Sequence, residues 1–377
     1  MLEKFIPQLV ALRPLSEAQV NEAVAALVNE AVPAATKADF LAQLARKGET
    51  AEEIAAFARA LREKSVVPPL DAETRAREIL DVCGTGGDRL GTFNISTTVA
   101  LVCAAAGVTV AKHGNRAITS QSGSADVLEA LGIKIDLSPA DAARSLRKHS
   151  FAFFFAPNYH PAFKYIAPAR KLCAERGQRT IFNFLGPLLN PARPTAQLIG
   201  VPRPELCEPL ARVLQSLGVR RGMVVCGSVV GRVTPCAPGW EQQAGGAHGV
   251  TRPTFDATRN TQHARLDELS TLGENTVAEF YQERGFACST LAPEQFPLQP
   301  ATLTDLIGGD RNANAEIVRR ILHGDERGPK RDAVLLNAGA ALFVAGRARS
   351  ISDGWQLAAQ VIDGGSAETK LRELAGR

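Results

Sequence analysis

Apolar residues at the helical period dominate the first part of the chain. A capping-box pair, Ser16 and Gln19, precedes the first amphipathic segment, and similar starts occur at Thr36 and Thr50. These patterns predict three helices whose apolar stripes pack against one another. The paired prolines of residues 65–70 exclude helix, so we expect a linker there.

From Ile79 onward, short apolar runs alternate with amphipathic segments, which is typical of a layered α/β domain. Strands are predicted at about 79–82, 108–111, 133–136, 151–156, 198–201 and 223–226. Helices are predicted at about 99–106, 125–131, from Pro139, and at 204–217, 316–323, 331–345, 352–362 and 366–375.

The predicted fold class is therefore α/β, in two parts. Residues 1–70 form a small N-terminal helical domain, joined by helices from about 160–185. Residues 76–377 form a larger domain whose central, mostly parallel β-sheet is flanked by helices. Residues 228–265 break the pattern, because they are rich in Gly, Pro, Thr and Arg and keep no period. A loop of this length is either functional or disordered, and we expect an insertion there.

The stretch after the first strand has the composition of an anion site. Gly84, Gly86 and Gly87 let several backbone N–H groups point at one anion. The hydroxyl-rich residues 94–98 then open a helix, whose N-terminus favours phosphate. The loop is neither GxGxxG with a downstream acid nor GxxxxGK[ST], so the two common nucleotide-binding fingerprints do not describe it.

A second group of polar residues follows the next strand. It contains Lys112, His113, Asn115 and Arg116 at the strand end, and then Thr119, Ser120, Ser122 and Ser124 before another helix. Two phosphate-type helix starts on either side of a basic strand end imply a ligand with more than one phosphate.

Composition narrows the class of protein further. The chain has 377 residues, 45% of them hydrophobic, and a net charge of +4 that no single block concentrates. Seven cysteines include no CxxC pair, which argues against zinc and disulfide frameworks. No apolar h-region follows Glu3 and Lys4, and the longest nearly uncharged run, 93–111, is too polar to span a bilayer. We expect a cytoplasmic protein.

The motifs GTGGD, TFNIST, KHGNR and SGSADVLEALG, in this order and at tight spacing, resemble the anthranilate phosphoribosyltransferases of tryptophan biosynthesis. The resemblance runs from about residue 10 to 370, and the stretch 228–265 interrupts it where that family has a short turn. It implies transfer of the 5-phosphoribosyl group from 5-phosphoribosyl 1-diphosphate (PRPP) to the amine of anthranilate, with release of pyrophosphate. It also implies a homodimer formed through the helical domain.

The resemblance carries over to particular residues. The PRPP-binding set would be Gly84, Gly87, Asp88, Thr92, Asn94, Ile95, Ser96, Thr97, Lys112, His113, Gly114, Asn115, Arg116, Ala117, Ile118, Thr119, Ser120 and Ser124. Two Mg²⁺ ions would bind per site, one at Ser96 and Glu268 and the other at Asp267 and Glu268. Anthranilate would be held by Gly84, Asn115 and Arg170, with His113 and His160 lining its approach. No acid or base is implied, because an aniline amine is unprotonated at neutral pH and positioning with charge stabilisation suffices.

Three positions depart from the family pattern without removing a catalytic group. Arg89 stands where glycine is usual, Thr119 replaces a serine, and Gln121 stands where a basic residue is common. Asp267 and Glu268 alone would be read as a solvated acidic pair, and only their LDELS context makes them candidate metal ligands.

Two other classes of function stay open. A pyrimidine-nucleoside-phosphorylase-like enzyme would share the fold, but its KxSGRGxGHTGGT-type run is replaced by KHGNRAITSQSGSAD here. A non-catalytic, nucleic-acid-binding relative should show a concentrated basic surface and missing site residues. The dispersed charge and the retained motifs favour the transferase.

Overall fold

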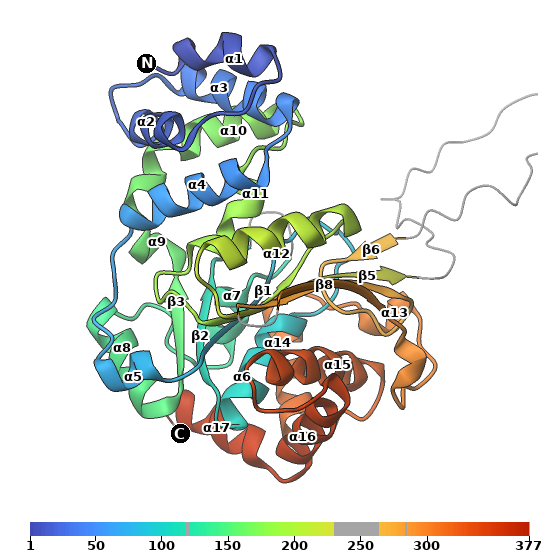
Figure 1. Ribbon diagram of the computed structural model, residues 1–377. Helices are drawn as coiled ribbons and strands as arrows, with labels where there is room; N and C mark the ends of the chain where they lie inside the picture. The colour runs from blue at the N-terminus through green and yellow to red at the C-terminus, as the bar shows by residue number, and fades with distance from the viewer. Residues whose placement is uncertain (118–120, 230–263, 283–284, 377) are drawn as a thin grey trace, which may run out of the picture.

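The computed structural model describes residues 1–117, 121–229, 264–282 and 285–376 (Figure 1). Helices at the N-terminus form a bundle, drawn in blue at the top of Figure 1. They are η1 (Glu3–Phe5), α1 (Ile6–Val10), α2 (Glu17–Leu27), α3 (Ala34–Lys47) and α4 (Ala51–Glu63). A later helix, α10 (Ala167–Glu175), joins them by packing against α3.

Two of the three predicted helix starts in the bundle are confirmed. Capping boxes begin α2 at Ser16 and α4 at Thr50. The predicted start at Thr36 is wrong, because α3 begins two residues earlier, directly after Pro33. The helix forms there without a side-chain cap, and Pro33 itself stays extended at the N-cap position, with φ −58° and ψ 143°.

An eight-stranded sheet is the centre of the larger part of the molecule. Its strands are β1 (Ile79–Gly84), β2 (Thr109–Gly114), β3 (Phe151–Phe155), β4 (Ala196–Gly200), β5 (Arg221–Val229), β6 (Ala264–Leu266), β7 (Asn275–Tyr281) and β8 (Gly285–Leu291). The order is β3-β2-β1-β4-β5-β7-β8, with β6 also paired to β5. Strands β1 to β5 pair in parallel, whereas β6, β7 and β8 pair antiparallel. The predicted fold class, α/β with a mostly parallel sheet, is confirmed.

Helices cover both faces of this sheet. The remaining helices are α5 (Ala72–Ala76), α6 (Ile95–Ala105), α7 (Ser124–Ala130), α8 (Pro139–His149), α9 (Ala156–Tyr159), η2 (Pro161–Tyr165), α11 (Phe182–Leu185), η3 (Gly186–Leu189), η4 (Pro204–Leu206), α12 (Cys207–Ser216), η5 (Pro293–Gln295), α13 (Leu303–Leu306), α14 (Arg311–His323), α15 (Pro329–Val344), α16 (Ile351–Asp363) and α17 (Ser366–Leu374). Among the described residues, no helix is both long and apolar enough to cross a membrane.

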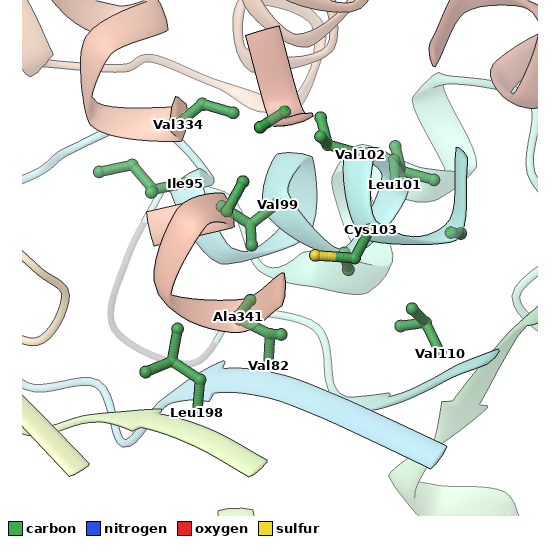
Figure 2. Packing of buried hydrophobic residues seen from close by; sticks show 14 of the residues in the cluster. Val82, Ile95, Val99, Leu101, Val102, Cys103, Val110, Leu198, Val334 and Ala341 are labelled. Carbon is green, nitrogen blue, oxygen red and sulfur yellow. The ribbon is translucent and has the colours of Figure 1, made fainter. Parts of the chain in front are cut away.

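Alternate residues of the strands face two different cores. Val82 and Leu198 pack with α6 and α15 on one face, as Figure 2 shows. Cys83 and Ile199, their neighbours in the same strands, belong to a second core with α12 and the N-terminal bundle. The bundle is therefore packed onto one face of the sheet, and the carboxyl ends of the parallel strands open beside it.

Two sequence expectations fail in this part of the chain. The predicted strand at 133–136 is wrong, because Ile133 and Ile135 bury their side chains without entering the sheet. The N–H of Ile133 instead bonds Leu128 and closes the end of α7. The antiparallel strands β7 and β8 were not expected. Of the expected insertion at 228–265, residues 230–263 lie outside the described part of the chain.

The buried ion pair of Lys47 and Glu53 supports the bundle, with 2.6 Å between Nζ and Oε2. Glu53 also accepts a hydrogen bond from the N–H of Leu15 and completes the capping box of Thr50. We expect Glu53→Ala to lower the free energy of unfolding by about 3–5 kcal/mol, because Lys47 would stay buried without its partner. Urea unfolding measures this effect. The exposed first-turn acid of the same helix, Glu52, is the control, and an equal loss in Glu52→Ala would contradict the account.

Candidate active site

The candidate site lies at the carboxyl ends of parallel strands β1, β2 and β4. These strands end at Gly84, Gly114 and Gly200, and the loops that follow them meet at one edge of the sheet. In open α/β sheets this edge is where ligands bind. Most of the predicted site residues that the structure describes lie here.

Asp267 and Glu268 rest directly on three of the strand ends. A Cβ atom added to Gly84 or Gly200 would overlap Asp267, and one added to Gly227 of β5 would overlap the backbone of Glu268 and Ser270. Only glycine permits this close approach. Chain segments far apart in sequence are thus brought together, and the acidic pair belongs to the site rather than to a solvated surface.

Carboxylates crowd this position. The pKa of Glu268 is raised to about 7, chiefly because burial removes its carboxyl from water. The pKa of Asp267 is raised well above its usual value by burial and by the neighbouring Asp88 and Glu268 carboxylates. Asp267 also accepts a 2.6 Å hydrogen bond from the N–H of Gly86. Oδ2 of Asp88 is buried and finds no donor among the described residues.

A single buried cation opposes these acids from inside the sheet. Lys112 is 1% exposed, and its Nζ donates a 2.7 Å hydrogen bond to the carbonyl of Val82. Burial lowers the pKa of Lys112, while Asp81, Cys83 and Glu268 act in the opposite direction. Carboxyl groups therefore outnumber the cationic side chain in the immediate surroundings of Lys112.

This donor set fits a divalent metal that shares its ligands with a substrate. Among the described residues, no three His, Cys, Asp or Glu side chains converge closely enough to hold a metal by themselves. Mg²⁺ usually uses one or two carboxylates and completes its octahedral shell with phosphate oxygens and water. Asp267, Glu268 and the hydroxyl of Ser96, whose backbone N–H and side chain both act to lower the pKa of Glu268, supply hard oxygen ligands of this kind.

The loop between β1 and α6 has the backbone of an anion cradle. Gly86 and Gly87 have φ angles of 75° and 93°, and α6 begins at Ile95 with no side-chain cap on its N-terminus. Its first N–H groups therefore face the site with the positive end of the helix dipole. Arg89, which replaces a glycine of the family pattern, has a φ of 59° and adds backbone strain to the loop.

The residues that follow β2 contact α7 in two ways, through their backbone and through a side chain. Asn115 and Ala117 lie beside the start of α7, and Ser124 Oγ donates to the carbonyl of Asn115 at 3.4 Å. Arg116 points at α7 instead, where its guanidinium pairs with Asp126 at 2.9 Å and Glu129 at 3.0 Å. The predicted residues Ile118, Thr119 and Ser120 lie outside the described part of the chain.

A row of rings leads from the strand end towards the helical bundle. His113 and His160 place their Nε2 atoms 3.2 Å apart, and His160 packs against Phe163 at 5.3 Å between ring centroids. Phe163 in turn packs against Phe182 at 5.6 Å, and the guanidinium of Arg170 lies 5.4 Å from the Phe182 ring. This row, His113–His160–Phe163–Phe182–Arg170, is a path of rings that lie tilted or edge-to-face to one another, and it ends in a cation.

Several residues that support the site carry no local sequence signal. The carboxyl of Asp81 lies behind the end of β2, accepting hydrogen bonds from His113 N–H at 3.3 Å and Asn190 Nδ2 at 2.8 Å. Asn314 in α14 donates a 2.8 Å hydrogen bond to Asn94 at the start of α6. Both partners of each pair are distant in sequence, so only the fold reveals them.

Comparison with known protein families identifies the class of protein to which this chain belongs. Residues 3–65 match the helical bundle domain of a glycosyl transferase family, and residues 76–258 and 260–368 match its a/b domain. An anthranilate phosphoribosyltransferase of Geobacter sp. (strain M21) is 41% identical over 385 residues, covering 99% of this chain and 98% of that protein. One from Lacticaseibacillus casei (strain BL23) is 46% identical over 337 residues, covering 89% and 86%.

Solved structures agree with this assignment. The crystal structure of anthranilate phosphoribosyltransferase from Thermus thermophilus superposes with a TM-score of 0.80 at 38% identity, covering 98% of both chains. The Saccharomyces cerevisiae enzyme in complex with PRPP and Mg shares the fold, with a TM-score of 0.79 at 24% identity over 100% of this chain and 97% of that one. The chain belongs to the anthranilate phosphoribosyltransferase family, as the sequence motifs predicted.

Acid sensitivity should follow from His160. Burial lowers the pKa of His160 to about 4 and that of His113 to about 3, from an ordinary value of 6.5. Between pH 6.5 and about 4 the unfolded chain takes up a proton on His160 that the folded chain excludes. The free energy of unfolding therefore decreases as the pH is lowered through this range. The wild type should lose free energy of unfolding between about pH 7.5 and about pH 5, and His160→Gln should make this loss smaller by roughly 2 kcal/mol.

Urea unfolding at the two pH values measures this difference. Val334→Ala provides the control, since it removes only apolar volume and should lower the free energy of unfolding equally at the two pH values. An unchanged pH dependence in His160→Gln would contradict the burial of a neutral imidazole at this position.

Proposed function

We propose that this protein transfers the 5-phosphoribosyl group of PRPP to the amine of anthranilate, giving N-(5-phosphoribosyl)anthranilate and pyrophosphate in tryptophan biosynthesis. The observation that carries the proposal is the seating of Asp267 and Glu268 on the glycines that end β1 and β4. This seating joins an acidic metal-binding pair, a glycine-rich anion loop and the buried Lys112 at one strand edge. A substrate with several phosphates and a bound cation suits such a site.

The phosphates of PRPP are assigned to the loop and to the start of α6. Gly84, Gly87, Asp88, Thr92 and residues 94–97 surround this position, and residues 112–117 and Ser124 close it from the β2 side. Ile118, Thr119 and Ser120 complete the predicted set from outside the described residues. The guanidinium of Arg116 is paired with Asp126 and Glu129, and its backbone N–H donates to Oδ1 of Asn115, so a contact with PRPP would exchange one of these interactions.

Magnesium is assigned to the acidic pair. One ion would use Ser96 and Glu268, and a second would use Asp267 and Glu268. A bound Mg²⁺ neutralises charge that develops on the pyrophosphate leaving group. The pKa of Asp267 and that of Glu268 are raised by burial first and then by the neighbouring carboxylates, and this supports the assignment, because a divalent cation favours the ionised form of both acids.

The acceptor is assigned to the row of rings. Its ring faces and edges suit contact with the benzene ring of anthranilate, and the Arg170 guanidinium matches the carboxylate with a fork of donors. Gly84 and Asn115 lie at the other end of the row, beside the phosphate loop. His113 and His160 stay neutral at physiological pH because burial lowers the pKa of each, so they line the path without adding charge.

Positioning and charge stabilisation account for the reaction. Breaking the C1–O bond of PRPP leaves a cationic ribose and an anionic pyrophosphate, while the amine nucleophile needs no base. Lys112 supplies a fixed positive charge, and the loop N–H groups require no reorganisation as charge moves to the leaving group. The neutral His113–His160 pair keeps the acceptor side apolar.

Neither alternative function matches this arrangement as well. A nucleoside phosphorylase binds one phosphate, whereas the acidic pair and the anion loop together suit a diphosphate with metal ions. A nucleic-acid-binding relative is disfavoured, because Arg116 is paired with acids and Arg170 lies over a ring, rather than both being gathered on one basic face.

The domain boundary, the homodimer and the cytoplasmic location stay predictions, and the molecule's surface and composition support them. We divide the chain at residue 70, with α10 and its neighbours in 160–185 counted in the helical domain. A homodimer through that domain would cover Met1, Val10 and Leu12, which are 74%, 62% and 69% exposed. A cytoplasmic location agrees with free, mostly buried cysteines among the described residues.

The first test follows the loss of anthranilate fluorescence with PRPP and Mg²⁺. The wild type should consume anthranilate, and Asp267→Ala/Glu268→Ala should lower the rate at least about 100-fold by removing the metal-binding carboxylates. Glu294→Ala, which removes an exposed acid elsewhere, should not change the rate. No turnover by a wild type that still binds PRPP would indicate a different acceptor and overturn the proposed reaction.

The acceptor site has its own test at Arg170. Arg170→Ala should raise the KM for anthranilate roughly 10- to 100-fold and leave the KM for PRPP nearly unchanged, because the lost group pairs only with the acceptor carboxylate. Steady-state kinetics with each substrate varied separates the two constants. Arg176→Ala is the control, since this exposed arginine at the end of α10 pairs with Asp39. Equal increases in both KM values would remove Arg170 from the acceptor site.

A further inference from the structure

A buried asparagine in α15 holds the backbone next to the acidic pair. Asn337 is 0% exposed, and its carboxamide forms two hydrogen bonds with Leu269, the residue after Glu268. The N–H of Leu269 donates to Oδ1 at 2.9 Å, and Nδ2 donates to the carbonyl of Leu269 at 2.9 Å. The carboxamide of Asn337 thus donates one hydrogen bond to the backbone of Leu269 and accepts another from it, as the backbone of a neighbouring strand would.

Within the described parts of the chain, no strand provides these partners. Strand β6 pairs with β5 only as far as Leu266, so the ladder stops before Asp267. A third hydrogen bond, from Nδ2 to the carbonyl of Ala333 at 2.9 Å, fixes the orientation of the carboxamide from its own helix. Asn337 therefore has a single arrangement that satisfies every bond.

The position of Asn337 is fixed by the packing of α15. Val334 and Ala341, on the same helix, point into the core formed with α6, β1 and β4, as Figure 2 shows. This core lies directly behind the strand ends that carry Gly84 and Gly200. Asn337 thus connects the most deeply packed helix of the domain to the segment 267–270.

We propose that Asn337 is a positioning residue for metal binding, which acts by holding the Leu269 backbone so that the Glu268 and Asp267 carboxylates face the phosphate loop. This inference rests on the proposed function, in which those carboxylates hold Mg²⁺. The glycines beneath the pair exclude side chains, and the N–H of Gly86 holds the Asp267 carboxylate, so Asn337 adds a directional restraint on the backbone that follows Glu268. The adjacent Ser270 is held separately, by Asn275 at 2.6 Å.

The test measures cation binding directly rather than turnover. Mn²⁺ serves as the probe, and its binding in the presence of PRPP is followed by loss of the free-ion electron paramagnetic resonance signal. Asn337→Ala should weaken Mn²⁺ binding about 10- to 100-fold, which is typical for loss of a group that orients a metal ligand. The KM for anthranilate should stay near the wild-type value, since the acceptor path is not touched.

A matched variant separates positioning from general destabilisation. Val334→Ala removes buried volume from the same helix without touching Leu269, so it should lower the melting temperature and leave Mn²⁺ affinity unchanged. If Asn337→Ala does not fold, Asn337→Ser replaces it, because serine keeps a polar group of smaller reach.

Wild-type Mn²⁺ affinity in the Asn337 variant would overturn the inference while leaving the proposed function intact. Equal weakening in Val334→Ala would also overturn it. If the wild type binds PRPP but no Mn²⁺, the metal role of the acidic pair fails, and the role of Asn337 fails with it.

Discussion

The close contact between residues 267–270 and the ends of three strands is the constraint on which the site depends. Gly84, Gly200 and Gly227 leave no room for a side chain between the sheet and this segment. The contact brings carboxylates within interaction distance of a phosphate-type loop and of Lys112, which is buried in β2. A single methyl group at any of the three glycines would lift the acidic pair off the sheet.

Electrostatics explain why such an arrangement suits a metal-dependent reaction of anions. Burial raises the pKa of Asp267 and Glu268, and the repulsion among Asp88, Asp267 and Glu268 adds to the increase. Divalent cations that lie between the carboxylates and the phosphates of PRPP neutralise the negative charge of both groups. Cations without PRPP, or PRPP without cations, would leave an excess of one charge in the site. The acceptor side has the opposite character, since neutral histidines and aromatic rings separate Arg170 from the phosphate loop.

The sequence predicted those features that depend on local pattern. Capping boxes at Ser16 and Thr50 and the glycine-rich loop are encoded within a few residues, and the structure has the helices and the loop where they were expected. The strand predicted at 133–136 failed because alternation of Ile with polar residues describes burial on one side but not a hydrogen-bonding partner. Asp81, Asn314 and Asn337 act through partners 32 to 220 residues away, so no window of sequence could identify them.

Calorimetric titration of PRPP into the wild-type protein, without acceptor, tests the central claim most directly. The claim is that the crowded carboxylates and the substrate phosphates can occupy this edge together only when divalent cations lie between them. At constant ionic strength, we expect PRPP to bind at least about 100-fold more tightly with Mg²⁺ than with a chelator present. Equal affinity under both conditions would contradict the account, because the carboxylates would then have no cation to share with the substrate.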